Sequence, residues 1–402
     1  MSQLLTCGVC KSTDLRASLS FGEQPPSNRF FNAATSADEV AERHHLSLGY
    51  CGNCGTIQLV NRMPVEAVRP RYDWLVYHEP EGHLDDVADT LANLALDKKS
   101  RFIGVTYKDQ STLDRLSRRG FSNIACVNEG DLNCDLRPFG LETIQKILSD
   151  ESDVGRLRNI YGTADVLLVR HIVEHAADAV RFIKSLKNLL LPGGYMMLEL
   201  PDSEWVLSAN NHAFIWEEHI SYFTATSVVQ LAHAAGAQLV RLDRYRYPFE
   251  DSLIVILRFD DTTPVNSQVT SGGARSTGTV LADFALGLDT SREKWRTELK
   301  ALIAEGEKIA VFGGGHLAAK FINFYGLADL IDCVIDDHPL KQGMAMPGSA
   351  LPICPSSELG TRGIRVCIST LSPESEVKVR VKQADFFANG GVFIPAFSMG
   401  RD

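Results

Sequence analysis

The chain has 402 residues, and its 40 Lys and Arg against 50 Asp and Glu give a formal net charge of −10 at pH 7. This length exceeds what one hydrophobic core usually organises, and 45% apolar with 22% charged residues is ordinary for folded proteins, so we expect two or three globular domains. The negative charge, the lack of a long apolar run and the lack of a secretory-type start argue against nucleic-acid binding and membrane insertion. They predict a cytoplasmic protein with a small-molecule substrate.

Residues 1–65 contain two Cys-x-x-Cys pairs, Cys7 with Cys10 and Cys51 with Cys54, roughly forty residues apart. Each pair places two sulfurs on one tight turn, and two such turns supply the four thiolates of a tetrahedral zinc site. The pattern therefore predicts a zinc-binding domain with a structural Zn²⁺. A redox dithiol and a chance pairing are the alternatives.

Residues 66–258 alternate strand-like and helix-like segments, which predicts a parallel sheet covered by helices. The expected strands are 102–106, 124–127, 165–169 and 195–199. Ligands bind beyond the carboxyl ends of such strands, so Arg170, His171 and His175, which follow the third strand, are expected to face a pocket. In the alternative interpretation the two histidines only end the strand and lie in solvent at the start of the next helix.

The segment 214–223, FIWEEHISYF, brings an acid, an imidazole and a phenol within five residues, namely Glu218, His219 and Tyr222. Histidine titrates near neutral pH, and an adjacent carboxylate can orient the ring and raise its basicity. The segment therefore predicts proton transfer with a bound substrate. The alternative is that its aromatic side chains and its histidine belong to the core.

Residues 259–277 are rich in Ser, Thr and Gly and predict an exposed linker. A third domain, 279–402, follows with a long helix over 279–305 and a second alternation of strands and helices. Its glycine run ending at His316 follows a strand and opens a helix, where backbone N–H groups can bind an anion. A dinucleotide site and a purely structural turn are the alternatives for that run.

Motifs along nearly the whole chain carry a resemblance to a known family. After the two cysteine pairs come VEH at the end of a strand, LPGGYMMLELPD, EEHISYF and DDHPLKQGMAMPG. In this order they resemble the zinc-containing sugar C-methyltransferases, which use S-adenosylmethionine (SAM) to methylate a ketosugar attached to a nucleoside diphosphate. The resemblance implies an α/β protein with an N-terminal zinc-binding domain, a class I methyltransferase (Rossmann-like) domain and a C-terminal Rossmann-like domain.

The resemblance also implies roles for individual side chains. His219 would be the base that removes the proton next to the ketone, supported by Glu218 and His175, and Tyr77 would correspond to an active-site tyrosine of the family. An imidazole can remove such a proton, and the enolate carbon can then attack the methyl group of SAM if the two are held in line. Tyr222 or His175 would stabilise the enolate oxygen.

The cofactor loop departs from the family pattern of E-x-G-x-x-x-G after the first strand. With Asp109 aligned, Gly104 stands in the acidic position, and Thr106 and Gln110 stand in the two glycine positions. Side chains at glycine positions are expected to crowd the methionine part of the cofactor.

Further cofactor contacts are expected from residues that follow the next strands. Glu129, after the second strand, would bind the ribose hydroxyls, and Arg170 and His171 would line the cofactor side of the pocket. Two functions remain open at this point: a SAM-dependent C-methyltransferase of a nucleotide-activated 4-keto-deoxysugar, or a protein of the same fold that does not use SAM. The latter would be an enolising epimerase or isomerase, or a non-catalytic nucleotide-sugar binding protein.

Overall fold

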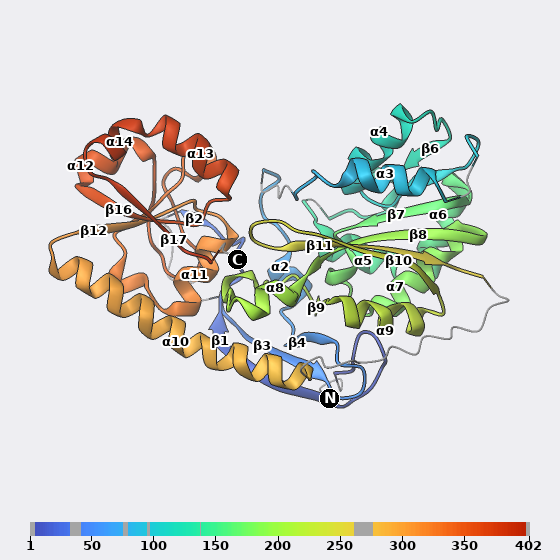
Figure 1. The fold of residues 1–402 in the computed structure, drawn as a ribbon, viewed down its shortest axis with the longest axis horizontal. Helices are drawn as coiled ribbons and strands as arrows, with labels where there is room; N and C mark the ends of the chain where they lie inside the picture. The colour runs from blue at the N-terminus through green and yellow to red at the C-terminus, as the bar shows by residue number, and fades with distance from the viewer. Residues whose placement is uncertain are drawn as a thin grey trace.

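The computed structural model describes residues 5–32, 42–74, 79–94, 97–136, 138–260 and 276–398. Figure 1 shows three bodies: a small sheet near the N-terminus, a central sheet covered by helices, and a C-terminal body that a long helix joins to the first sheet. Within the described residues, no helix has both the length and the apolar character that a membrane crossing needs.

The first body is an antiparallel sheet of four strands in the order β1-β3-β4-β9. Its strands are β1 (Leu15–Gln24), β3 (His44–Cys51), β4 (Ile57–Asn61) and β9 (Ser221–Tyr222). The last strand comes from the expected second domain and pairs Tyr222 with Ile57. The N-terminal sheet is therefore completed by the segment that carries EEHISYF.

The central body is a sheet of six strands in the order β10-β11-β8-β7-β5-β6. Its strands are β5 (Phe102–Gly104), β6 (Ile124–Cys126), β7 (Ala164–Arg170), β8 (Leu190–Asp202), β10 (Gln238–Tyr245) and β11 (Asp251–Arg258). The first four are parallel, as the alternation predicts, and β11 runs antiparallel to both of its neighbours. The four predicted strands are therefore confirmed.

Helices cover both faces of the central sheet because its inner strands are apolar on both sides. Leu167 and Val169 of β7 pack in one core with α5, α6, α7 and α9, whereas Val166 and Leu168 pack in another with α3 and α4. The bounds are α3 (Leu84–Ala92), α4 (Gln110–Arg118), α5 (Leu141–Leu148), α6 (Glu151–Tyr161), α7 (Ala179–Leu186) and α9 (Ala225–Ala235). Such two-sided burial is typical of parallel α/β sheets.

The C-terminal body is a parallel sheet of five strands in the order β15-β13-β12-β16-β17. The elements are α10 (Thr277–Ala304), β12 (Lys308–Phe312), α11 (His316–Tyr325), β13 (Cys333–Ile335), β15 (Ile353–Cys354), α12 (Leu359–Arg362), β16 (Ile364–Ser369), α13 (Pro373–Lys382), α14 (Ala384–Ala388) and β17 (Val392–Pro395). The predicted Rossmann-like alternation is confirmed, including the helix that opens at His316. Most of the expected linker, residues 261–275, lies outside the described residues.

The N-terminal sheet shares one hydrophobic core with the C-terminal body. Phe21 of β1 stacks on Phe324 of α11 with ring centroids 4.1 Å apart. The helix α10 packs along the same sheet, and a Cβ at Gly278 would lie only 2.6 Å from the Tyr50 hydroxyl, so glycine permits this close approach.

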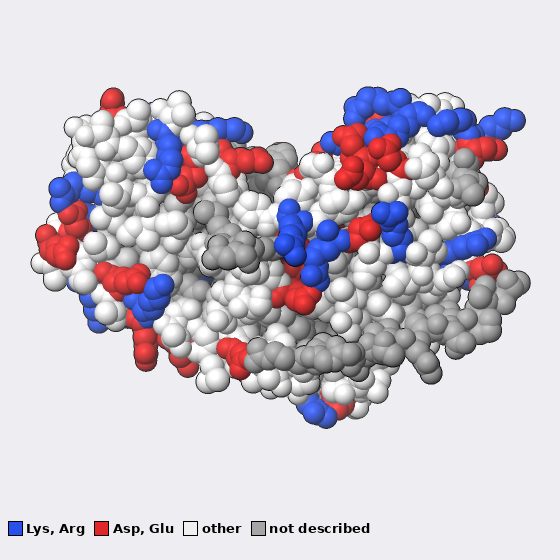
Figure 2. Space-filling view, in the orientation of Figure 1, with Lys and Arg blue, Asp and Glu red and all other residues white. Residues whose placement is uncertain are grey.

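On the surface over α3 and α4, acidic and basic side chains form ion pairs and do not separate into an acidic and a basic patch. Figure 2 shows blue and red side chains side by side there, and Arg119 lies between Asp85 and Asp89. Exposed pairs of this kind contribute little to stability.

A buried ion pair joins α11 to the segment 214–223. Glu217 and Lys320 are each 1% exposed, and the Lys320 Nζ lies 2.5 Å from Glu217 Oε2. The backbone N–H of Ser27 also donates to this carboxylate. Burial opposes ionisation, but the charges of Lys320 and His316 outweigh it and lower the pKa of Glu217 to about 2.

Lys320→Met is expected to lower the free energy of unfolding by about 3–5 kcal/mol, because it leaves the Glu217 carboxylate buried and unpaired. Urea unfolding measures this. The matched control is Lys294→Met, since Lys294 forms an exposed pair with Glu298 at 4.0 Å. This control should change stability by less than about 0.5 kcal/mol, and equal effects of the two substitutions would contradict the role of the buried pair.

The Glu217–Lys320 pair also makes the free energy of unfolding depend on pH in a predictable direction. Folding lowers the pKa of Glu217 from 4.5 to about 2, so its stabilisation is present above pH 4.5 and is lost as the pH falls toward 2. Unfolding measured at about pH 5 and about pH 3 should therefore show a steeper loss of stability in the wild type than in Lys320→Met.

Candidate active site and zinc site

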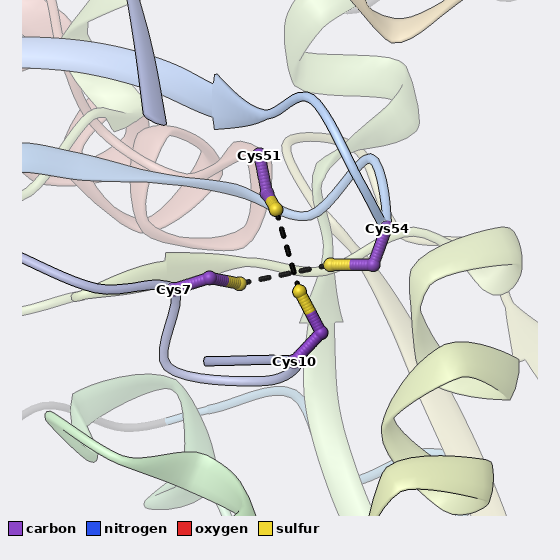
Figure 3. A group of neighbouring side chains, drawn as sticks. All are labelled: Cys7, Cys10, Cys51 and Cys54. Carbon is purple, nitrogen blue, oxygen red and sulfur yellow. Dashed lines mark hydrogen bonds between the residues drawn. The ribbon is translucent and has the colours of Figure 1, made fainter. Parts of the chain in front are cut away.

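The four predicted zinc ligands meet at one point (Figure 3). Cys7 and Cys10 lie on the turn before β1, while Cys51 ends β3 and Cys54 lies on the turn into β4. The Sγ atoms of Cys7 and Cys54 are 3.6 Å apart, those of Cys10 and Cys51 are 3.4 Å apart, and all four lie within 4.8 Å of one another.

This arrangement fits a tetrahedral zinc ion. Zn–S bonds of 2.3 Å place the sulfurs of a tetrahedron about 3.8 Å apart, close to the spacing found here. Four thiolates leave no open coordination position, so the site is structural. The zinc turn also contacts the central body, because the Val180 N–H of α7 donates to the Gly8 carbonyl.

A cavity of about 450 Å³ lies beyond the carboxyl end of β7. Most of its wall comes from the turn after β7, the segment 214–223 and the stretches that follow β5 and β6. The other lining residues are Asn28, Pro70, Tyr72, Asp73, Glu79, Pro201 and Glu250. The predicted residues on its wall are Glu129, His171, His175, Glu218 and His219. The cavity therefore joins the predicted catalytic segment to part of the predicted cofactor site.

Two segments far apart in the sequence converge on the cavity through their histidines. The rings of His175 and His219 meet edge to face with centroids 4.7 Å apart, and Glu174 lies beside both. Trp216 stacks on His219 at 5.1 Å and on His316 at 3.9 Å, so a side chain of the C-terminal body supports the catalytic segment from behind.

Burial sets the protonation of this cluster. It lowers the pKa of His219 to about 4 and that of His175 well below its usual range, so both imidazoles are neutral near pH 7. Burial raises the pKa of Glu174 to about 7. Burial, with the neighbouring charges of Glu217 and Glu142, raises the pKa of Glu218 well above its usual range. The cluster therefore offers neutral bases beside carboxyl groups that can donate a hydrogen bond.

This protonation changes the expected role of Glu218. A neutral carboxyl group does not raise the basicity of His219 as a carboxylate would. Its Oε1 instead accepts a hydrogen bond from Asn28 Nδ2 at 3.5 Å, and the side chain faces the cavity as an acid.

Tyr222 does not belong to the cavity wall. It is 4% exposed, and its hydroxyl donates to the Trp216 carbonyl at 2.7 Å. This hydrogen bond joins its side chain to the backbone of Trp216 within the same segment. Tyr77 lies outside the described residues.

The remaining predicted cofactor residues form the support of the loop after β5. Asp109 is fully buried and accepts hydrogen bonds from the N–H groups of Val105, Thr106 and Arg170. Arg170 turns away from the cavity and pairs with Glu199 at 2.5 Å. A Cβ at Gly104 would lie 2.6 Å from the Asp109 Cβ, which explains the glycine there.

The side chains at the two glycine positions, Thr106 and Gln110, are directed to hydrogen-bond partners of the loop and of α4. The Thr106 hydroxyl points back to accept the Lys108 N–H at 3.3 Å. The Gln110 amide donates to Asp114 at 2.7 Å on the outer surface. Neither side chain is part of the cavity wall.

Sequence reasoning missed two charged residues of the site. The Nζ of Lys108 lies 2.9 Å from Oε1 of Glu79, and both residues line the cavity. The position of Lys108 in the loop after β5, where the cofactor is expected, could have pointed to it as a cavity residue. Glu79 lies within the aromatic and acidic stretch 72–83, YDWLVYHEPEGH, which the sequence offers only as a candidate lid.

Sequence models of three protein families match this chain in succession. A zinc binding domain matches residues 7–68, a methyltransferase domain matches 71–242, and a C-methyltransferase C-terminal domain matches 272–397. Together they cover most of the chain, and their order is the order of the three bodies in Figure 1.

The C-methyltransferase NovU of Streptomyces niveus is 26% identical over 267 residues, which are 63% of this chain and 62% of that protein. The match thus spans less than two thirds of the relative's length.

Among solved structures, the N-methyltransferase NodS of Bradyrhizobium japonicum is 12% identical, with 45% of this chain and 99% of that chain covered at a TM-score of 0.26. The 1,6-didemethyltoxoflavin-N1-methyltransferase of Burkholderia thailandensis, solved with S-adenosylhomocysteine, is also 12% identical, with 44% and 79% covered at a TM-score of 0.29.

Cys51→Ser is expected to abolish binding of one zinc ion per chain, because the closed site loses a ligand. A loss of about 3 kcal/mol would lower the melting temperature by roughly 10 °C. Metal analysis and thermal unfolding measure the two effects. The control Cys134→Ser lies outside the four-cysteine group and should keep both zinc and melting temperature. Full zinc content in Cys51→Ser would contradict the assignment.

Proposed function

The chain belongs to the zinc-containing C-methyltransferases, and from this we propose that it is a SAM-dependent C-methyltransferase that acts on a nucleotide-activated 4-keto-deoxysugar. The observation that carries the proposal is the meeting of His175, His219 and Glu218 in one cavity beyond the carboxyl end of β7. The sugar class rests on the resemblance of EEHISYF and DDHPLKQGMAMPG to that family.

The chemistry follows from the protonation of the cluster. The neutral imidazole of His219 can accept the proton next to a ketone, since burial holds its pKa at about 4 and keeps it unprotonated before the substrate binds. The carboxyl groups of Glu174 and Glu218 can donate hydrogen bonds to the oxygen on which negative charge develops. Tyr77 would also act on the substrate, as the resemblance implies.

The residues around the cavity fit SAM. Glu129 follows β6, where an acid binds ribose hydroxyls, and Pro138, Phe139 and Leu141 give an apolar wall for a flat base. Acidic side chains outnumber basic ones on the wall, which suits a positively charged sulfonium. When bound, SAM supplies an electrophilic methyl group, and this chain supplies the base and the hydrogen bonds to the substrate.

The alternative function on the same site is SAM-independent enolisation. It was favoured by the loss of glycines in the loop after β5. Since the side chains of Thr106 and Gln110 stay off the cavity wall, this ground for the alternative is removed.

His219→Gln is expected to lower turnover of a nucleoside-diphosphate 4-keto-6-deoxysugar by roughly 10²–10⁴-fold, because the general base is lost. It should also abolish exchange of the α-proton with deuterium from solvent, measured by NMR, while SAM affinity stays unchanged.

The control His233→Gln changes an exposed histidine on α9 and should leave both reactions intact. Near-normal turnover in His219→Gln would contradict the assignment of His219 as the base. A wild-type protein that exchanges deuterium but never transfers a methyl group would favour the isomerase alternative.

A further inference from the structure

The side chain of Lys108 places a cation on a cavity wall that carries several acidic residues. Among the cavity-lining residues that the structure describes, it is the only lysine or arginine. Its side chain is 9% exposed, and its ammonium lies 2.9 Å from the Glu79 carboxylate. Burial opposes the charge of both groups. The charges of His171 and Lys108 nevertheless lower the pKa of Glu79 to about 2, so the two side chains form an ion pair inside the cavity.

Three N–H groups of the loop around Lys108 are already used within the loop. A glycine-rich loop usually binds anionic groups through free backbone N–H groups. Here the N–H groups of Val105 and Thr106 both donate to Asp109, at 2.8 and 2.9 Å, and the Lys108 N–H donates to Thr106 Oγ1 at 3.3 Å. These three groups are not free to bind a carboxylate, whereas the Lys108 side chain faces the cavity and can bind one.

The turn that carries Lys108 is held firmly in place. The turn, η1 (Tyr107–Asp109), directly follows β5, and Arg170 donates a hydrogen bond to the Lys108 carbonyl. Arg170 is itself held by the fully buried Glu199. The lysine side chain thus projects into the cavity from a rigid base.

We propose that the Lys108–Glu79 pair binds the α-amino acid end of SAM, with the Lys108 ammonium on its carboxylate and the Glu79 carboxylate on its ammonium. An amino acid zwitterion carries the two charges that this pair complements, and an ammonium has three donors, so Lys108 can hold Glu79 and a ligand carboxylate together. The side-chain pair takes the place of the backbone N–H groups of a glycine-rich loop. This inference rests on the proposed function, because it concerns the same cofactor.

The test compares two ligands that differ by one carboxylate, SAM and decarboxylated SAM, by isothermal titration calorimetry. Lys108→Met should weaken SAM binding by roughly 10- to 100-fold, the usual effect of losing a hydrogen bond between charged groups, and should leave decarboxylated SAM unchanged. Glu79→Gln should weaken both ligands, because both keep the ammonium. The matched control is Lys146→Met, an exposed lysine on α5, which should change neither affinity.

Three outcomes would overturn the inference. Tighter SAM binding by Lys108→Met would mean that the lysine fills the amino acid site. Unchanged SAM binding would mean that it makes no contact. An equal loss for both ligands would mean that it only supports the fold, which thermal unfolding of the variant would confirm. A folded wild-type protein that binds neither ligand would overturn the proposed function itself, which distinguishes the two failures.

Discussion

A carboxylate that water cannot reach needs a cation beside it, and for Glu217 that cation is Lys320 of the C-terminal body. The condition is met only while α11 packs against the segment 214–223. The next two residues of that segment, Glu218 and His219, face the cavity, and Trp216 stacks between His219 and His316. The C-terminal body therefore holds the catalytic segment in position. None of its described residues lines the cavity.

The N-terminal body is joined to the same segment by its backbone. The strand β9 completes the zinc-bearing sheet, and the Ile220 N–H donates to the Glu174 carbonyl at 2.7 Å. This bond brings the turn after β7 to the segment that carries His219. The four cysteines lie at the same end of that sheet, because Tyr50, next to Cys51, pairs with Ile57, and Ile57 pairs with Tyr222. Zinc bound there would fix the strands to which the catalytic segment is joined.

Inside the cavity, burial divides the ionisable groups into two sets. Burial outweighs the charges around His175, His219 and Glu218 and keeps these groups neutral. Lys108 and Glu79 stay charged because each lies beside the other. The neutral set suits proton transfer, and the charged pair suits a ligand group that carries both charges.

Short sequence patterns were enough to predict several features of this protein. The spacing of the cysteine pairs predicted the zinc site, the alternation of apolar segments predicted the parallel sheets, and the position of His175 after a strand predicted that it faces a pocket. Each depends only on neighbours in the chain, since strand direction and turn spacing are local properties.

Only the folded structure shows in which direction a side chain points and which distant residue it contacts. It turned Tyr222 and Arg170 away from the cavity, kept Thr106 off its wall, and brought Lys320 to Glu217. The sequence gives no sign of these pairings, because a buried charge selects its partner by position in space and not by position in the chain.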